Sequence, residues 1–153
     1  MELLDSPSAD QWRLHGSHEP VALASPAAGS ALTYTVSGAV QIVVHSAVML
    51  YTASSNAANR IPYLEILDTT GTPVASCSPG FTYVASDAVI VSFGLGQTLF
   101  GANSSARAGC GIPEIRLQDG MQVKLGAVGI NATDAITKAR LYVRQWNVQP
   151  FSD

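Results

Sequence analysis

From Leu32 onward, apolar side chains recur at every second position, and no long stretch repeats them at helical spacing. The clearest case is near the end of the chain, where Ile115 and Leu117 alternate with Glu114 and Arg116. Turns that contain Gly, Pro or Asp separate the short runs. Successive side chains of a strand point to opposite faces of its sheet. The pattern therefore predicts an all-β sandwich or barrel.

The longest run, residues 40–52, is apolar on both of its expected faces. We expect one face to carry Val40, Ile42, Val44, Val48 and Leu50. We expect the other face to carry Val43, Ala47, Met49 and Tyr51. A strand that is apolar on both sides is central in its sheet or covered by a partner.

Residues 1–31 differ from the remainder, because Pro, Ser, Ala and Gly dominate and no strand or helix period lasts. We interpret them as an extended N-terminal arm, followed by a β-sandwich domain over residues 32–153. The arm carries Leu3, Leu4, Trp12 and Leu14, which a fully solvated tail would not need. Two alternatives stay open: a disordered terminus, or an arm that docks on a neighbouring subunit. In either case we expect the sandwich to fold without the arm.

Charged residues make up only 12% of the chain, against about 25% in an ordinary soluble domain. Interface cores are depleted in charge, so this composition favours a protein that packs against copies of itself or against other proteins. The net charge of −3 gives no overall attraction to nucleic acid, and no apolar run is long enough to span a membrane. The first residues lack the basic start and apolar run of a secretion signal.

The expected final strand, residues 136–148, has a basic and aromatic outer face. Alternation places five side chains on it, namely Lys138, Arg140, Tyr142, Arg144 and Trp146. At this spacing Arg144 can contact either flanking ring. The stripe is a candidate protein interface, and the acidic arm is one candidate partner for it. The alternatives are a solvated face, or a surface that binds nucleic acid or glycan.

Candidate catalytic and metal-binding residues are few. The three histidines do not cluster as ligands of a tetrahedral zinc ion, and we expect His45 to be a half-buried strand residue. Cys77 and Cys110 lack the CxxC spacing of a redox motif, which favours simple packing roles. The acidic residues considered as a catalytic pair are Glu65, Asp68, Glu114 and Asp119, and they fit turns or strand faces. We therefore expect no enzymatic activity, cofactor or metal ion.

Three segments carry a family resemblance: residues 59–71 (NRIPYLEILDTTG), residues 111–123 (GIPEIRLQDGMQV) and residues 134–146 (DAITKARLYVRQW). Their order and turns are similar to those of small jelly-roll structural proteins of tailed-bacteriophage virions, over most of residues 38–148. The resemblance implies a jelly-roll-like antiparallel β-sandwich. It also implies a non-enzymatic capsid decoration or cement protein, a head fibre base or a tail accessory protein.

These observations predict a virion protein, assembled in the bacterial host cytoplasm, that forms a homo-oligomer and binds other virion proteins such as the major capsid protein. The alternative is a carbohydrate-binding or lectin-like β-sandwich module, for which Tyr142 and Trp146 would be the best ring pair.

Overall fold

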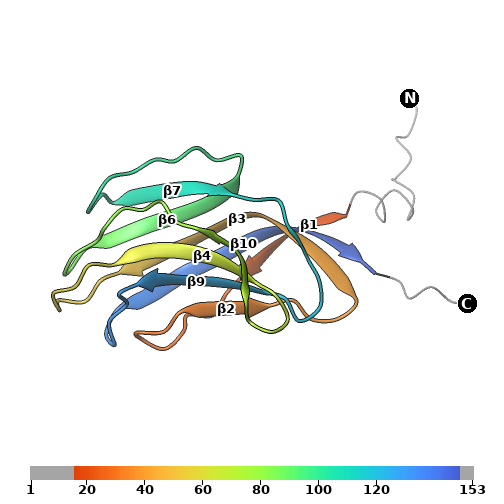
Figure 1. The fold of residues 1–153 in the computed structure, drawn as a ribbon, viewed down its shortest axis with the longest axis horizontal. Coiled ribbons are helices and arrows are strands. Elements are labelled where there is room, and N and C mark those ends of the chain that lie inside the picture. Colours follow the sequence, from red (N-terminus) through yellow and green to blue (C-terminus); the bar gives the residue numbers. More distant parts are fainter. Residues whose placement is uncertain (1–15, 149–153) are drawn as a thin grey trace, which may run out of the picture.

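The computed structural model describes residues 16–148, which form two β-sheets packed face to face (Figure 1). The strands are β1 (Ser17–Ala22), β2 (Leu32–Thr35), β3 (Val40–Thr52), β4 (Ile61–Leu67), β5 (Pro73–Cys77), β6 (Ala88–Leu95), β7 (Arg107–Ile112), β8 (Arg116–Leu117), β9 (Gln122–Val128) and β10 (Ala135–Asn147). No residue of this range is helical, which confirms the all-β prediction. The described residues accordingly contain no helix able to cross a membrane.

The order of the strands is that of a jelly roll. The six-stranded sheet runs β1-β10-β3-β6-β7, with β8 also paired to β3, and the four-stranded sheet runs β2-β9-β4-β5. Four antiparallel pairs are nested in the chain, because β1 pairs with β10, β2 with β9, β3 with β6 and β4 with β5. Two Greek keys of this kind define the jelly roll, so the expected fold is confirmed. One departure is β7, which pairs parallel to β6.

The core lies between the sheets and is built by the alternation seen in the sequence. On β4, Leu64 and Ile66 are fully buried while Tyr63 and Glu65 face outward, and on β9, Leu125 is buried beside the half-exposed Lys124. Because every second side chain of each inner face enters the core, the two sheets are held together mainly by apolar burial.

Two β-bulges change which side chains of β3 and β10 reach the core. The β10–β3 register shifts between Thr137 and Arg140, where Lys138 has a φ of +53°, and again between Tyr142 and Val143, where His45 is the extra residue on β3. A bulge inserts one residue and so reverses the alternation beyond it.

The faces expected for residues 40–52 are therefore partly wrong. Ile42 and Val44 enter the core, but beyond His45 the core side chains are Ala47, Met49 and Tyr51, while Val48 and Leu50 face outward. The central position of the strand is confirmed, since β3 lies between β10 and β6.

Strand β1 lies in the segment that the sequence assigns to the arm. Its six residues pair with β10 from Ser17↔Gln145 to Ala22↔Arg140 and form one edge of the six-stranded sheet. The sequence does not signal this strand, because Pro20 and the charged Glu19 interrupt any apolar alternation. Pro and charge are common on edge strands, where one side of the backbone is unpaired. The domain boundary after residue 31 stays a prediction.

A buried ion pair joins the loops at one end of the sandwich. Arg60 and Asp134 are both fully buried, and the guanidinium donates from Nε and Nη2 to the two carboxylate oxygens at 3.0 Å each. The Tyr51 hydroxyl donates to Oδ2 at 2.5 Å, and the Ser54 and Asn131 amides donate to the same carboxylate at 2.8 Å. Burial would raise the pKa of Asp134, but the hydrogen bonds from Arg60, Ser54 and Tyr51 together hold it well below its ordinary value.

We expect Tyr51→Phe to lower the free energy of unfolding by about 1–3 kcal/mol, because it removes one donor from a buried charged acceptor and little volume. Asp134→Asn should cost about 3–5 kcal/mol, since it leaves the buried Arg60 charge uncompensated. Denaturant unfolding measures both. Tyr34→Phe is the matched control, because the half-exposed Tyr34 on β2 takes part in no such network. Equal stabilities for the two Tyr→Phe variants would contradict this account.

The same carboxylate predicts acid sensitivity. The folded pKa of Asp134 lies below the unfolded value of about 3.9, so its contribution to stability is complete above that pH and is lost as the pH falls toward the folded pKa. Thermal melts of the wild type should therefore fall steeply below about pH 4. In Asp134→Asn the slope should be shallower, and an unchanged slope would count against the assignment.

Two truncations test the arm boundary. A chain that starts at residue 16 keeps β1 and should melt like the full chain at concentrations where both are monomeric. A chain that starts at residue 32 loses β1 and its ladder to β10, which we expect to cost at least about 2 kcal/mol, or roughly 4–8 °C in Tm. Unchanged melting of the shorter chain would instead support an independent sandwich from residue 32 onward.

Candidate binding surface

Positive charge gathers on the outer face of the six-stranded sheet. Of the eight Lys and Arg residues, Arg13 lies outside the described range, Arg60 is buried, and Lys124 forms an ion pair with Glu65 at 3.5 Å on the other sheet. The remaining five are Arg107, Arg116, Lys138, Arg140 and Arg144.

Strand register places these five cations on one face. On β10, Arg140 and Arg144 alternate with the buried Leu141 and Val143, so their side chains leave the sheet on the outer side. Cα pairing aligns Arg144 with Val43 and Val43 with Arg116. At the opposite edge of the sheet, Arg107 on β7 pairs in parallel register with Ile90, whose side chain is 41% exposed on the same outer face. Of the described residues in the strands of this sheet, Glu19 on β1 alone is acidic.

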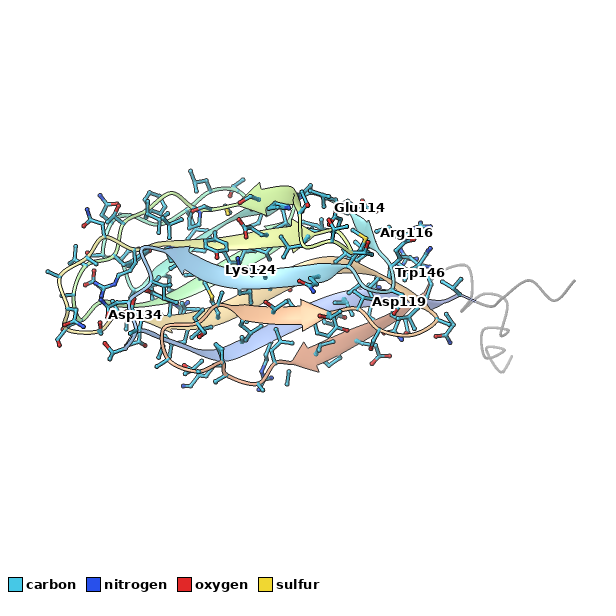
Figure 2. The ribbon with its side chains drawn as sticks, turned by 60° about the horizontal axis from the view of Figure 1, so that its bottom comes forward. Glu114, Arg116, Asp119, Lys124, Asp134 and Trp146 are labelled. Atoms are coloured by element: carbon cyan, nitrogen blue, oxygen red, sulfur yellow. The ribbon has the colours of Figure 1, made fainter. Side chains whose placement is uncertain are left out.

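Trp146 forms the centre of an Arg–Trp–Arg cluster at one end of this face. The guanidinium carbons of Arg144 and Arg116 lie 4.9 Å and 5.1 Å from the indole centroid, which is cation–π distance. Figure 2 shows Arg116 and Trp146 at the end of the molecule opposite Asp134. Gly16 packs closely here, because a Cβ at that position would lie 2.9 Å from Cε2 of Trp146 and φ is +68°. The indole is thus held in place by contacts from three separate segments of the chain.

Beside this cluster lies a group of three rings. His18 on β1 stacks on Tyr142 with centroids 5.6 Å apart, and His45, the bulged residue of β3, meets His18 edge-on at 5.0 Å. The bulge turns His45 outward, where it lies 6.4 Å from Tyr142. Tyr142 remains 44% exposed, so the group presents an aromatic surface between the cations of β10.

An apolar groove of about 200 Å³ lies farther along the same face. Its walls are Val48, Leu50 and Ile90, with Lys138 at the rim and Met49 below. The two bulges create it, because they turn Val48 and Leu50 outward and bring Lys138 beside them. The outer face therefore combines cations, aromatic rings and an apolar groove.

A second hollow of about 450 Å³ lies at the end of the molecule that holds Trp146. It is lined by residues 38–41, Gln118, Asp119 and Val148. Asp119 accepts a hydrogen bond from the Gly38 amide at 2.9 Å, and Val148 donates from its amide to the Ala39 carbonyl at 2.8 Å. These two hydrogen bonds satisfy backbone groups of the lining at Gly38, Ala39 and Val148. The hollow therefore offers mainly apolar surface.

The structure brings together the five stripe residues named from the sequence. Lys138, Arg140 and Tyr142 are exposed on the outer face, and Arg144 and Trp146 are half-buried there. The predicted contact between Arg144 and a flanking ring is present, with Trp146. The binding role of the stripe stays a prediction. Leu3, Leu4, Trp12 and Leu14 lie outside the described residues.

The sequence did not connect Arg116, Arg107, His18 or His45 with this face. Alternation with Leu117 showed that Arg116 faces outward, but the sheet to which it belongs depends on pairing with β3. For His18 no strand was expected, and for His45 the outward direction depends on the bulge.

The other candidate residues serve local structure. Asp68 accepts hydrogen bonds from the Thr70 and Thr72 amides and so closes the predicted turn after β4. Burial, with a further contribution from Cys77, raises the pKa of the Cys110 thiol to about 11, so this buried thiol stays protonated at neutral pH. Among residues 16–148, no group of three His, Cys, Asp or Glu residues is placed to hold a metal ion.

No family model matches the chain, and no curated protein matches it. Among solved structures, a chain in the crystal structure of the T13 viral particle of IBDV is similar over 87% of this chain, with 7% sequence identity and a TM-score of 0.43. The match covers 31% of the viral chain, so this chain spans about a third of its length. The likeness is weak and concerns the arrangement of strands alone.

A double-mutant cycle tests the Arg–Trp–Arg cluster. We expect Arg116→Ala and Trp146→Leu to show a coupling energy of about 0.5–1 kcal/mol in unfolding experiments, because each removes the same cation–π contact. Arg140 is the matched control on the same face, and its cycle with Trp146 should give a coupling near zero. Equal coupling in the two cycles would show that the indole has no specific guanidinium partner.

Proposed function

We propose that this chain is a non-enzymatic structural protein of a virion that self-associates and attaches to the capsid or tail surface. The observation that carries the proposal is the outer face of the six-stranded sheet. It concentrates five cations, four rings (His18, His45, Tyr142 and Trp146) and an apolar groove in a chain with only 12% charged residues. Tyr, Trp and Arg are the residue types that dominate the energy of protein interfaces.

The architecture supports this proposal without deciding it. Jelly rolls occur in viral capsid proteins, in lectins and in cupins, so the fold is compatible with a virion role and with sugar binding. A protein that functions as a building block needs a rigid scaffold and a surface that tolerates contact with neighbours. The two packed sheets supply the rigid scaffold, and the low charge of the chain favours a surface that tolerates contact with neighbours.

Residue chemistry supports a role without catalysis. Of the four acidic residues weighed as a catalytic pair, Asp68 and Asp119 accept backbone hydrogen bonds in turns, and Glu65 pairs with Lys124. Cys110 is buried with a raised pKa, the opposite of an activated nucleophile.

A carbohydrate-binding module is the second candidate, because Tyr142 and Trp146 share one exposed face. Sugar rings bind on open aromatic faces. Here two guanidinium groups lie over the Trp146 ring, and His18 is stacked on Tyr142. These contacts cover part of the ring surfaces on which a glycan would stack, so they favour the protein-binding role.

Sedimentation velocity tests the proposal. We expect wild-type protein to associate between about 1 and 100 µM, a range that detects weak protein contacts. Mass spectrometry of purified virions from the encoding virus should detect the chain as a stoichiometric component. A glycan array should give no binding, and a specific glycan hit on a monomeric protein would favour the lectin-like alternative instead.

A further inference from the structure

Within residues 16–148, the strands of the six-stranded sheet place no carboxylate beside the exposed Lys138 and Arg140 of its outer face. Among the described strands of that sheet, the one carboxylate, Glu19, pairs in register with the core residue Val143 and so alternates away from the outer face. The exposed Lys138 and Arg140 border the apolar groove, in which Ile90 is 41% exposed. A partner for this face must therefore be both acidic and apolar.

The first fifteen residues of the chain have this chemistry. They contain Glu2, Asp5 and Asp10 against one arginine, Arg13. Their large apolar side chains are Leu3, Leu4, Trp12 and Leu14. Acidic and apolar residues alternate in short blocks along this segment, so one extended stretch could meet both the cations and the groove.

The length of the segment matches the length of the face. Fifteen extended residues span about 50 Å. From Trp146 to the groove beside Lys138 the strand advances eight residues, or about 27 Å. The segment is therefore about 20 Å longer than the stripe, which leaves length to reach it from a neighbouring molecule.

The direction of β1 favours exchange of the segment between molecules. Strand β1 runs antiparallel to β10, from His18↔Arg144 to Ala22↔Arg140, so the chain before it attaches at the Trp146 end of the face. Gly16 packs against Trp146 there. Continuing β1 backward leads off the sheet, and a return to its own face would require the chain to reverse. The face of another molecule requires no such reversal.

Resting on the proposed self-association, we propose that residues 1–15 of one molecule bind the outer face of the six-stranded sheet of a second molecule. Acidic side chains of the segment meet Lys138, Arg140 and their neighbours, and leucines of the segment enter the groove of Val48, Leu50 and Ile90. The contact joins two different surfaces, so it closes as a reciprocal dimer or a larger ring, or continues as a chain of subunits.

Charge reversal in the full-length protein tests the contact. The face variant carries Lys138→Glu with Arg140→Glu, and the segment variant carries Asp5→Lys with Asp10→Lys. Each alone places like charges on the segment and the face, and should associate at least tenfold more weakly than wild type in sedimentation velocity. Mixed in equal amounts, the two variants restore opposite charges between molecules. The mixture should regain association to within about threefold of wild type, which is about half a logarithmic unit in Kd.

Lys124→Glu is the control, because it makes the same charge change as Arg140→Glu on the opposite sheet. It should leave association unchanged. If wild type is monomeric, both the self-association and this contact are overturned. If wild type associates and the variants do so equally well, only this contact is overturned. Rescue in a chain that carries all four substitutions, without rescue in the mixture, would place the segment on its own face and overturn the exchange between molecules.

Discussion

The ion pair between Arg60 and Asp134 is the polar constraint on which the loops at one end of this sandwich depend. Asp134 binds Tyr51 at the end of β3, the Ser54 amide in the next loop and the Asn131 amide before β10, and its own carbonyl accepts from Gly29 ahead of β2. Two charges without water are costly unless every donor and acceptor is satisfied. The satisfied network therefore ties the β1–β2, β3–β4 and β9–β10 loops together at one end of the molecule. Through Tyr51, it also ties the end of β3 to the residue that precedes β10.

Much of the fold was predictable from local pattern, because alternation is written directly into the strands. The inner and outer positions of β4 and the turn at Asp68 follow from neighbouring residues alone. The bulges at Lys138 and His45 do not, because an extra residue is defined only against the partner strand. Strand β1 was not predicted for the same reason, because Pro20 and Glu19 fit an edge strand only when the pairing with β10 is known.

The candidate surface divides in the same way. Its central stripe on β10 was visible in the sequence because one strand supplies all five side chains. Its flanks come from elsewhere, with His18 from β1, His45 from β3 and Arg116 from β8. Assembling a surface from several strands requires the sheet order, which no single segment encodes. The observed face has two features that the stripe lacks. The bulges create the apolar groove, and Arg116 places a second cation over Trp146.

The nested pairing of the strands has a consequence for how the molecule forms. The first described strand, β1, pairs with the last, β10, and β2 pairs with β9, so each sheet needs strands from early and late in residues 16–148 before it is complete. Contacts between distant residues slow folding, because a long loop must close before they form. During synthesis on the ribosome, β2 and β3 emerge well before β9 and β10 and must wait with apolar faces uncovered. Rapid release of the finished chain, or a chaperone that shields the early strands, would then govern the yield of native protein in a cell.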